Sequence, residues 1–113
     1  MDANVTVTIH GSPWKMADLA PLIPRCRTRT WRQQRWVKRD ALVERGTNLT
    51  LPYQGQPYNP VEFELVRGGW KRNTCEICWW ELMESDKPEH AVGYTDGRQW
   101  ICSECHDRFI KKH

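Results

Sequence analysis

The chain has 113 residues and a formal net charge of +3, and 39% of its residues are hydrophobic. This length allows one domain, or one small domain with an added metal-stabilised module. No apolar run approaches the roughly 18 residues that a membrane-spanning helix needs, and the first residues lack the pattern of a signal peptide, so we expect a cytoplasmic protein without a membrane partner.

The first predicted elements are a strand and a short helix. Residues 4–9 alternate apolar and polar side chains, several of them β-branched, and this pattern predicts a strand. Ser12 suits the N-cap of a helix and Pro13 suits its first position. We therefore predict a helix over residues 13–20, which the two following prolines would end.

Residues 25–45 form a basic segment with eight basic and two acidic side chains, a net charge of +6. Its periodicity fits a helix or a strand equally well. Arginines could pair with phosphates, and the interleaved tryptophans could stack on unpaired bases. A solvated basic face with its tryptophans in the core explains the segment at least as well. The residues that would contact nucleic acid are Arg27, Arg29, Trp31, Arg32, Arg35, Trp36, Lys38 and Arg39.

A pair of strands is predicted over residues 49–66. The two apolar stretches flank a loop rich in proline and glycine, and residues 61–66 alternate so that their apolar side chains share one face. Gly68 and Gly69 would end the second strand and act as a hinge. We therefore divide the chain into a β-rich N-terminal part, residues 1–68, and a cysteine-containing module, residues 69–113.

The cysteines give the strongest functional signal in the sequence. Four form two C-x2-C pairs, and Cys26 stands alone. An odd number of cysteines without an export signal argues against a disulfide framework, whereas paired C-x2-C motifs favour a metal. Tetrahedral Zn²⁺ with four thiolates would be structural, one ion per chain. The predicted zinc ligands are Cys75, Cys78, Cys102 and Cys105.

The segments around the cysteines predict the form of the module. Residues 90–94 and 98–101 flank an Asp-Gly turn and predict a hairpin. Residues 107–112 predict a helix, so that Cys102 and Cys105 would lie at its N-terminus, where the helix dipole favours thiolates. A first cysteine turn, a hairpin and a second pair that opens a helix are the order of a treble-clef zinc finger. A zinc ribbon would have no helix after the second pair.

Two further features of the sequence lie next to cysteines and lead to predictions about packing and about a thiol pKa. Trp79 and Trp80 follow the first pair, where small residues often follow; we expect them to point to opposite sides and to pack in the core. Arg25 and Arg27 flank Cys26 and would lower the pKa of its thiol. A lone cysteine is still more often inert, and no partner histidine can be named for it.

A set of residues between 69 and 109 forms a recognisable pattern: Gly69-Trp70, Cys75-Glu76-Ile77-Cys78-Trp79, Gly93-Tyr94, Trp100-Ile101-Cys102, Cys105 and Phe109. This pattern resembles the C-terminal part of small bacterial proteins with four-cysteine treble-clef zinc fingers. Some proteins of this kind look like immunity or antitoxin partners encoded near toxins. The resemblance implies a metal site rather than an activity.

A weaker resemblance connects the C-terminus with nucleases. Residues 102–106 resemble the C-x2-C-H ending of cysteine-containing HNH endonucleases, and Glu89-His90 could stand for their Asp-His pair. However, no Asn lies between His90 and His106, and eleven residues separate His90 from Cys102, too few for the usual loop. The catalytic set of a nuclease is therefore incomplete, and we interpret both histidines as surface or hydrogen-bonded side chains.

Together these features predict an α+β protein with a β-rich N-terminal part, a short helix and a C-terminal treble-clef zinc finger. The first functional hypothesis is a non-enzymatic protein-interaction module, of the inhibitor or immunity type, in which zinc compensates for a small core. Residues 75–113 carry eight acidic and five basic side chains, a net charge of −3 that suits a basic protein partner. The alternative is nucleic-acid binding through residues 25–45, and an HNH-like nuclease is the least favoured.

Overall fold

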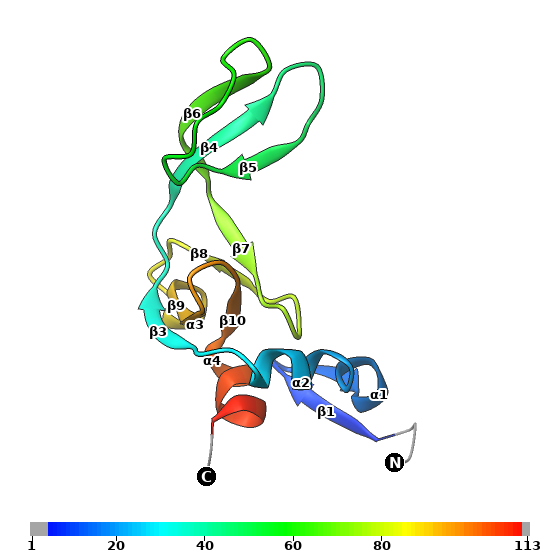
Figure 1. Ribbon diagram of the computed structural model, residues 1–113. Coiled ribbons are helices and arrows are strands. Elements are labelled where there is room, and N and C mark those ends of the chain that lie inside the picture. The colour runs from blue at the N-terminus through cyan, green and yellow to red at the C-terminus, as the bar shows by residue number, and fades with distance from the viewer. Residues whose placement is uncertain (1–4, 112–113) are drawn as a thin grey trace.

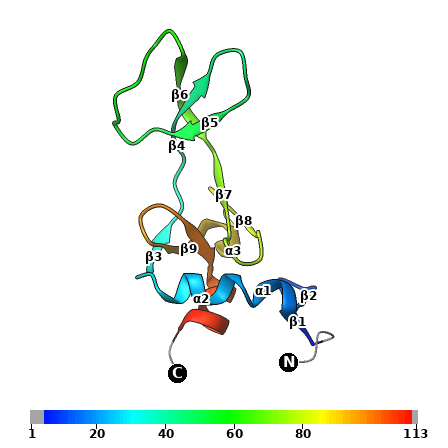
Figure 2. The same cartoon turned by 45° about the vertical axis from the view of Figure 1, so that its right-hand side comes forward.

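The computed structural model describes residues 5–111 of the chain, with principal extents of 52 × 28 × 25 Å. Two lobes lie along the long axis (Figures 1 and 2). We call residues 5–36 and 71–111 the metal lobe. The sheet of β4 (Arg39–Glu44), β5 (Thr50–Pro52) and β6 (Phe63–Trp70) is the distal sheet. The described part of the chain contains no helix that is long and apolar enough to span a bilayer.

The metal lobe combines short strands with short helices, so the fold is a mixed α+β arrangement. Its three small sheets are the β1–β2 hairpin, the β7–β8 hairpin and a three-stranded sheet in the order β10-β9-β3. Its elements are β1 (Thr6–Ile9), β2 (Ser12–Lys15), α1 (Met16–Leu19), α2 (Leu22–Arg27), β3 (Arg32–Arg35), β7 (Arg72–Thr74), β8 (Glu81–Met83), α3 (Pro88–Ala91), β9 (Val92–Thr95), β10 (Trp100–Cys102), α4 (Ser103–Cys105) and the π-helical turn η1 (His106–Ile110).

The N-terminal hairpin partly corrects the sequence prediction. The strand predicted over residues 4–9 is confirmed from residue 6 onward; Asn4 lies outside the described residues. The helix predicted from residue 13 is wrong in its first part, because β2 pairs antiparallel with β1 there. His10 and Gly11 have φ angles of 50° and 78°, the backbone of a two-residue turn that closes a hairpin. The helical segment begins at α1 instead.

The helix α1 ends at Leu19, in agreement with the predicted end at residue 20, but a second helix that was not predicted follows it. Pro21 is the N-cap of α2, and Pro24 lies within that helix. Proline is tolerated in the first turn of a helix, because the backbone N–H groups there have no intrahelical partner. The basic segment that follows is mainly extended: α2 ends at residue 27, and β3 and β4 (Arg39–Glu44) come next.

The distal sheet has β4 between β5 (Thr50–Pro52) and β6 (Phe63–Trp70). The two strands predicted over residues 49–66 exist, but each pairs with β4 and not with the other. β6 also continues through the two glycines that were expected to end it. A register shift opposite Arg39 and Ala41 accommodates them, and Gly68 takes a φ of 67°, which glycine adopts without strain.

The buried core lies in the metal lobe. Residues 5–26 contribute Ile9, Leu19, Ile23 and Cys26 to the same cluster as the four C-x2-C cysteines. A second cluster contains Trp36, Leu82 and Trp100. Within residues 5–111, the buried hydrophobic residues of the distal sheet are Ala41 and Leu42. The domain boundary at residue 68 stays a prediction, but β6 runs across it, and side chains from both sides of it share one core.

Candidate metal centre

The first cysteine pair lies in the turn between β7 and β8. These strands pair antiparallel, and the backbone N–H of Cys75 donates to the carbonyl of Trp80 at 2.8 Å. Inside the turn, the N–H of Trp79 donates to the carbonyl of Cys75 at 3.0 Å, and the N–H of Ile77 donates to Cys75 Sγ at 3.4 Å. These bonds hold the Cys75 and Cys78 side chains on one side of a tight loop.

The second pair lies where β10 passes into α4. The predicted hairpin is confirmed, since Cys102 pairs with Gly93 at the base of β9 and β10. His90 is not part of its first strand, because residues 88–91 form α3. Cys102 is the N-cap of α4, and its Sγ accepts from the N–H of Cys105 at 3.4 Å. The helical segment predicted after this pair is present as α4 and η1; Lys112 lies outside the described residues.

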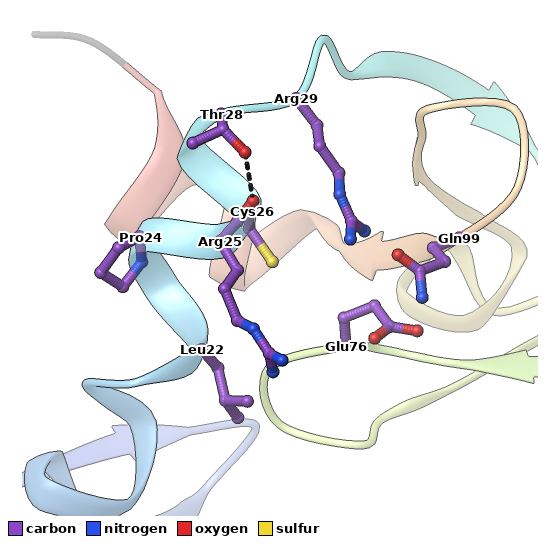
Figure 3. A pocket seen from close by; sticks show the side chains of 8 residues that line it. All are labelled: Leu22, Pro24, Arg25, Cys26, Thr28, Arg29, Glu76 and Gln99. Atoms are coloured by element: carbon purple, nitrogen blue, oxygen red, sulfur yellow. Dashed lines mark hydrogen bonds between the residues drawn. The ribbon is translucent and has the colours of Figure 1, made fainter.

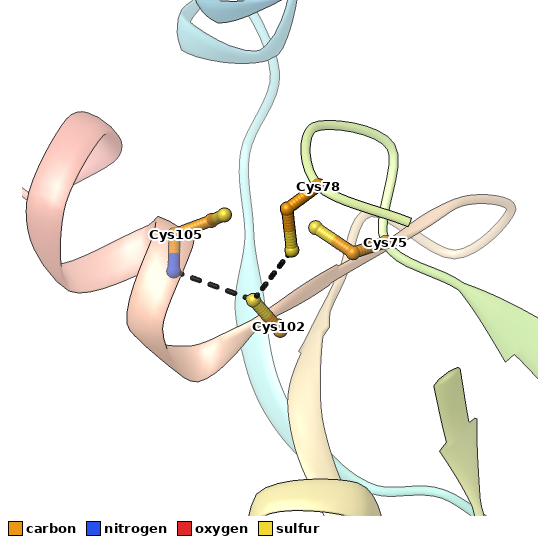
Figure 4. A group of neighbouring side chains, drawn as sticks. All are labelled: Cys75, Cys78, Cys102 and Cys105. Atoms are coloured by element: carbon orange, nitrogen blue, oxygen red, sulfur yellow. Dashed lines mark hydrogen bonds between the residues drawn. The ribbon is translucent and has the colours of Figure 1, made fainter. Parts of the chain in front are cut away.

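The structure brings the four predicted ligands together. Their Sγ atoms all lie within 4.8 Å of one another, and each cysteine is at most 6% exposed (Figure 4). Cys78 and Cys102 have an Sγ–Sγ distance of 3.6 Å, far longer than the bond of about 2.05 Å in a disulfide. Four sulfurs around one ion, each at about 2.3 Å, lie about 3.8 Å apart. The cluster therefore has the size and the donor set to hold one metal ion.

The electrostatics of the cluster also favour a cation. Hydrogen bonds from Cys102, Cys105 and Cys78 hold the pKa of Cys75 far below its ordinary value. The hydrogen bond with Cys102, and then those with Cys75 and Cys78, raise the pKa of Cys105. Without an ion, the cluster therefore favours ionisation of the Cys75 thiol and disfavours ionisation of the Cys105 thiol. A divalent cation would allow all four thiols to ionise together.

A histidine that sequence reasoning missed lies against the cluster. His10 Nε2 is 3.3 Å from Cys102 Sγ, and the backbone N–H of His10 donates to Glu104 Oε2 at 2.8 Å. A thiolate can only accept, so Nε2 carries the proton when Cys102 is ionised. Burial lowers the pKa of His10, which favours its neutral form. No turn was predicted at His10-Gly11, and nothing local in the sequence indicated a partner 92 residues away.

Trp80 lies between two histidine rings next to the cluster. Its ring stacks on His10 at a centroid distance of 3.7 Å and on His90 at 4.4 Å, and its Nε1 donates to the carbonyl of Glu89 at 2.8 Å. Trp80 thus packs against the core as expected. The expectation for Trp79 is wrong, because 72% of this residue is exposed.

His90 and His106 are packed side chains. His90 Nδ1 lies 2.7 Å from the carbonyl oxygen of Glu81. The ring of His106 stacks on the ring of Tyr94.

Several of the predicted nucleic-acid contacts are engaged within the protein. Arg27 Nε donates to the carbonyl of Phe109, and Arg29 forms an ion pair with Asp96 at 3.6 Å. Trp31 Nε1 donates to the carbonyl of Cys26. Trp36 is 2% exposed, so its ring cannot stack on a base.

The other predicted contacts lie on β3, in the connection between the lobes and at the start of β4. Arg32 and Arg35 lie on β3, where all four residues are exposed, and β3 is an edge strand of its sheet. Lys38 is exposed in the connection to the distal sheet, and Arg39 is the half-buried first residue of β4. The structure therefore spreads the basic segment over both lobes.

Cys26 lies in the wall of a cavity of about 540 Å³. The side chains of Arg25 and Arg29 point into this cavity toward Glu76 (Figure 3), so both signs of charge line it. The expected depression of the Cys26 pKa is wrong: burial of the thiol raises its pKa, and this effect exceeds the opposing effect of Arg29. Cys26 is a core residue, 2% exposed.

Comparisons of the chain with known protein families, curated proteins and solved structures find no match. The resemblance to small bacterial zinc-finger proteins therefore stays a prediction. The geometry shows four buried cysteines that could hold one metal ion.

Proposed function

We propose that the four cysteines bind one structural Zn²⁺ and that residues 72–111 form a treble-clef zinc finger. Structural zinc sites are usually closed, buried shells of four ligands such as four thiolates. Thiolate ligands in a tetrahedral arrangement favour Zn²⁺ over divalent ions that prefer oxygen ligands. The order of the elements supports the finger: the β7–β8 turn carries the first pair, the β9–β10 hairpin follows, and the second pair opens α4.

We further propose that the protein is a non-enzymatic interaction module of the inhibitor or immunity type. The single observation that carries this proposal is the burial of all four cysteines, each at most 6% exposed. Four thiolates fill a tetrahedral shell, so a substrate would find no open coordination position. The zinc would instead hold the two halves of a small core together, and the surface of the lobe would bind a partner.

The charge of residues 75–113 indicates the kind of partner, whereas the metal lobe as a whole is not acidic, because residues 5–36 are basic. Residues 75–113 carry a net charge of −3, and four thiolates with one Zn²⁺ would add a further −2. An acidic segment of this kind would favour and steer a basic protein, such as a nuclease toxin.

Cobalt substitution tests the closed shell. The zinc content of the purified protein should be one ion per chain. When Co²⁺ replaces zinc, it should show the absorption spectrum of a tetrahedral tetrathiolate complex, and excess azide should leave that spectrum unchanged. A spectrum that shifts with azide would show an open position and would contradict the structural role.

A second candidate function is nucleic-acid binding through β3, and the exposure of Arg32 and Arg35 on an edge strand favours it. Two phosphate contacts would make binding weaken with salt. Fluorescence anisotropy of labelled single- and double-stranded oligonucleotides, at low and moderate salt, tests it. The double variant Arg32→Gln/Arg35→Gln should reduce the salt dependence, whereas Arg67→Gln on the distal sheet should not. Absence of binding at low salt would exclude this function.

A further inference from the structure

We propose that the cavity between the β1–β2 hairpin and the β7–β8 turn binds a cationic side chain, lysine or arginine, of the protein partner. This inference rests on the proposed function, because it uses the charge of the zinc-loaded centre. The cavity measures about 260 Å³, the volume of a side-chain pocket, and its lining includes Trp14, Trp79, Trp80 and Glu81. It forms where the N-terminal hairpin packs on the first cysteine turn.

Trp79 is the most informative residue of this cavity. Its φ angle is 64°, a left-handed backbone conformation that bulky side chains rarely adopt. Glycine would take the same conformation without strain. The protein instead places a large indole there and leaves 72% of the residue exposed. Strain and an exposed tryptophan at one position are typical of a binding surface, where tryptophan contributes much of the binding energy.

The rest of the cavity is rigid before any partner binds. Both faces of Trp80 are covered, by His10 and His90, so Trp80 serves as a fixed wall. Trp14 lies on β2 opposite Val7 in the hairpin and packs against the core. Trp79 and Trp14 are therefore the indoles that could offer ring faces to a ligand. A preorganised pocket loses little entropy on binding.

The charges around the cavity select a cation over a neutral apolar group. Glu81 lies in the lining, and its ion pair with Arg72 is long, at 3.8 Å, and exposed, so it is easily exchanged. Cys78 also lines the cavity and would belong to a centre of charge −2 when zinc is bound. The two histidines of the lining are stacked on Trp80. A cation over an indole face gains a cation–π interaction in addition.

Nuclear magnetic resonance of the indole N–H groups of the zinc-loaded protein tests this proposal. The probes are N-acetyl-lysinamide, N-acetyl-argininamide and the neutral analogue N-acetyl-norleucinamide. The cationic probes should shift the Trp79 and Trp14 signals saturably and bind roughly tenfold more tightly than the neutral probe. The Trp36 signal should stay in place. Equal shifts with all three probes, or none, would overturn the proposal.

The variant Trp79→Gly separates binding from folding. Glycine suits the left-handed position, so the melting temperature should not fall, whereas the shift of the Trp14 signal by the lysine probe should be lost. Val61→Ala, an exposed apolar residue outside the metal lobe, is the control and should bind like the wild type. The zinc content of each sample distinguishes the two proposals. One zinc per chain without probe binding overturns the pocket alone, whereas absence of zinc overturns the proposed function and the pocket with it.

Discussion

His10 Nε2 lies 3.3 Å from Cys102 Sγ, so the N-terminal hairpin directly contacts a cysteine of the candidate metal centre. The backbone N–H of His10 makes a second bond across the same interface, to Glu104 in α4. Both bonds start from one residue of a two-residue turn, whose left-handed backbone aims the N–H and the ring toward the cluster. Docking of the hairpin and binding of the metal should therefore stabilise each other.

Replacement of His10 by asparagine should weaken metal retention by about tenfold, since loss of a hydrogen bond to a metal ligand typically reduces affinity 10- to 100-fold. Asparagine tolerates the left-handed turn, so the hairpin should still close. Transfer of zinc to a coloured chelator measures the effect. The matched control is His90→Asn, which removes a stacking partner of Trp80 without touching a cysteine. Equal rates of zinc transfer in the two variants would contradict a role for the N–H···S bond.

Asn73 should be needed for the stability of the junction between the lobes. Its Oδ1 accepts from Trp36 Nε1 at 3.0 Å and from Trp70 Nε1 at 2.9 Å. Asn73→Leu leaves two indole donors without an acceptor and should lower the free energy of unfolding by about 2–4 kcal/mol. Asn73→Asp keeps the acceptor and should lose less. Urea unfolding of the zinc-loaded proteins measures both, and equal losses would show that the hydrogen bonds are not the cause.

The clustering of the four cysteines could be predicted because its signal is local. A C-x2-C spacing brings two sulfurs together within one turn, and the Asp-Gly turn at residue 96 predicted the hairpin that joins the two pairs. The exposure of Trp79 could not be predicted in this way. Its hydrophobicity favoured burial, but its position in the turn gives it a left-handed backbone, and most of the residue stays exposed.

The errors arose where pairing between separate segments, near or distant in sequence, decides the structure. Ser12 has the chemistry of an N-cap, but β1 offers backbone partners to residues 12–15, and the strand forms instead. β5 and β6 looked like partners because they are neighbours in sequence; β4 lies between them and pairs with both. For Trp36 the sequence left two alternatives open, base stacking and a place in the core, and its burial next to Leu82 and Trp100 supports the core. A single sequence does not contain these pairings explicitly.

The variant Cys102→Ser should release the metal and unfold more than the C-terminal module. Ile9, Ile23 and Cys26 belong to the same buried cluster as Cys102, so residues 5–36 should lose protection together with β9 and β10. Hydrogen–deuterium exchange followed by mass spectrometry measures this loss peptide by peptide. Chelation of the metal from the wild-type protein should give the same pattern. Retained protection of α2 in the metal-free protein would show that the two segments fold independently.

Cys26 should resist alkylation at neutral pH, although two arginines flank it in the sequence. Burial raises the pKa of its thiol, so the folded protein favours the neutral form, which is a poor nucleophile. The pKa of Cys26 is higher in the folded protein than in the unfolded chain, so its neutral thiol contributes stability at pH values below 9.0, the ordinary thiol pKa. This contribution to stability is lost as the pH rises through the pKa of the folded protein.

Iodoacetamide treatment of the zinc-loaded protein, with mass spectrometry, tests the reactivity of Cys26. At neutral pH we expect no modified cysteine in the native protein and five after chelation and denaturation. The rate at Cys26 should rise only at pH values above the ordinary thiol pKa. The variant Cys26→Ala is the control: its native form should also show no modification, and its denatured form should show four. Modification of native Cys26 at neutral pH as fast as a free thiol would contradict its place in the core, because a reactive thiolate needs both access and a low pKa.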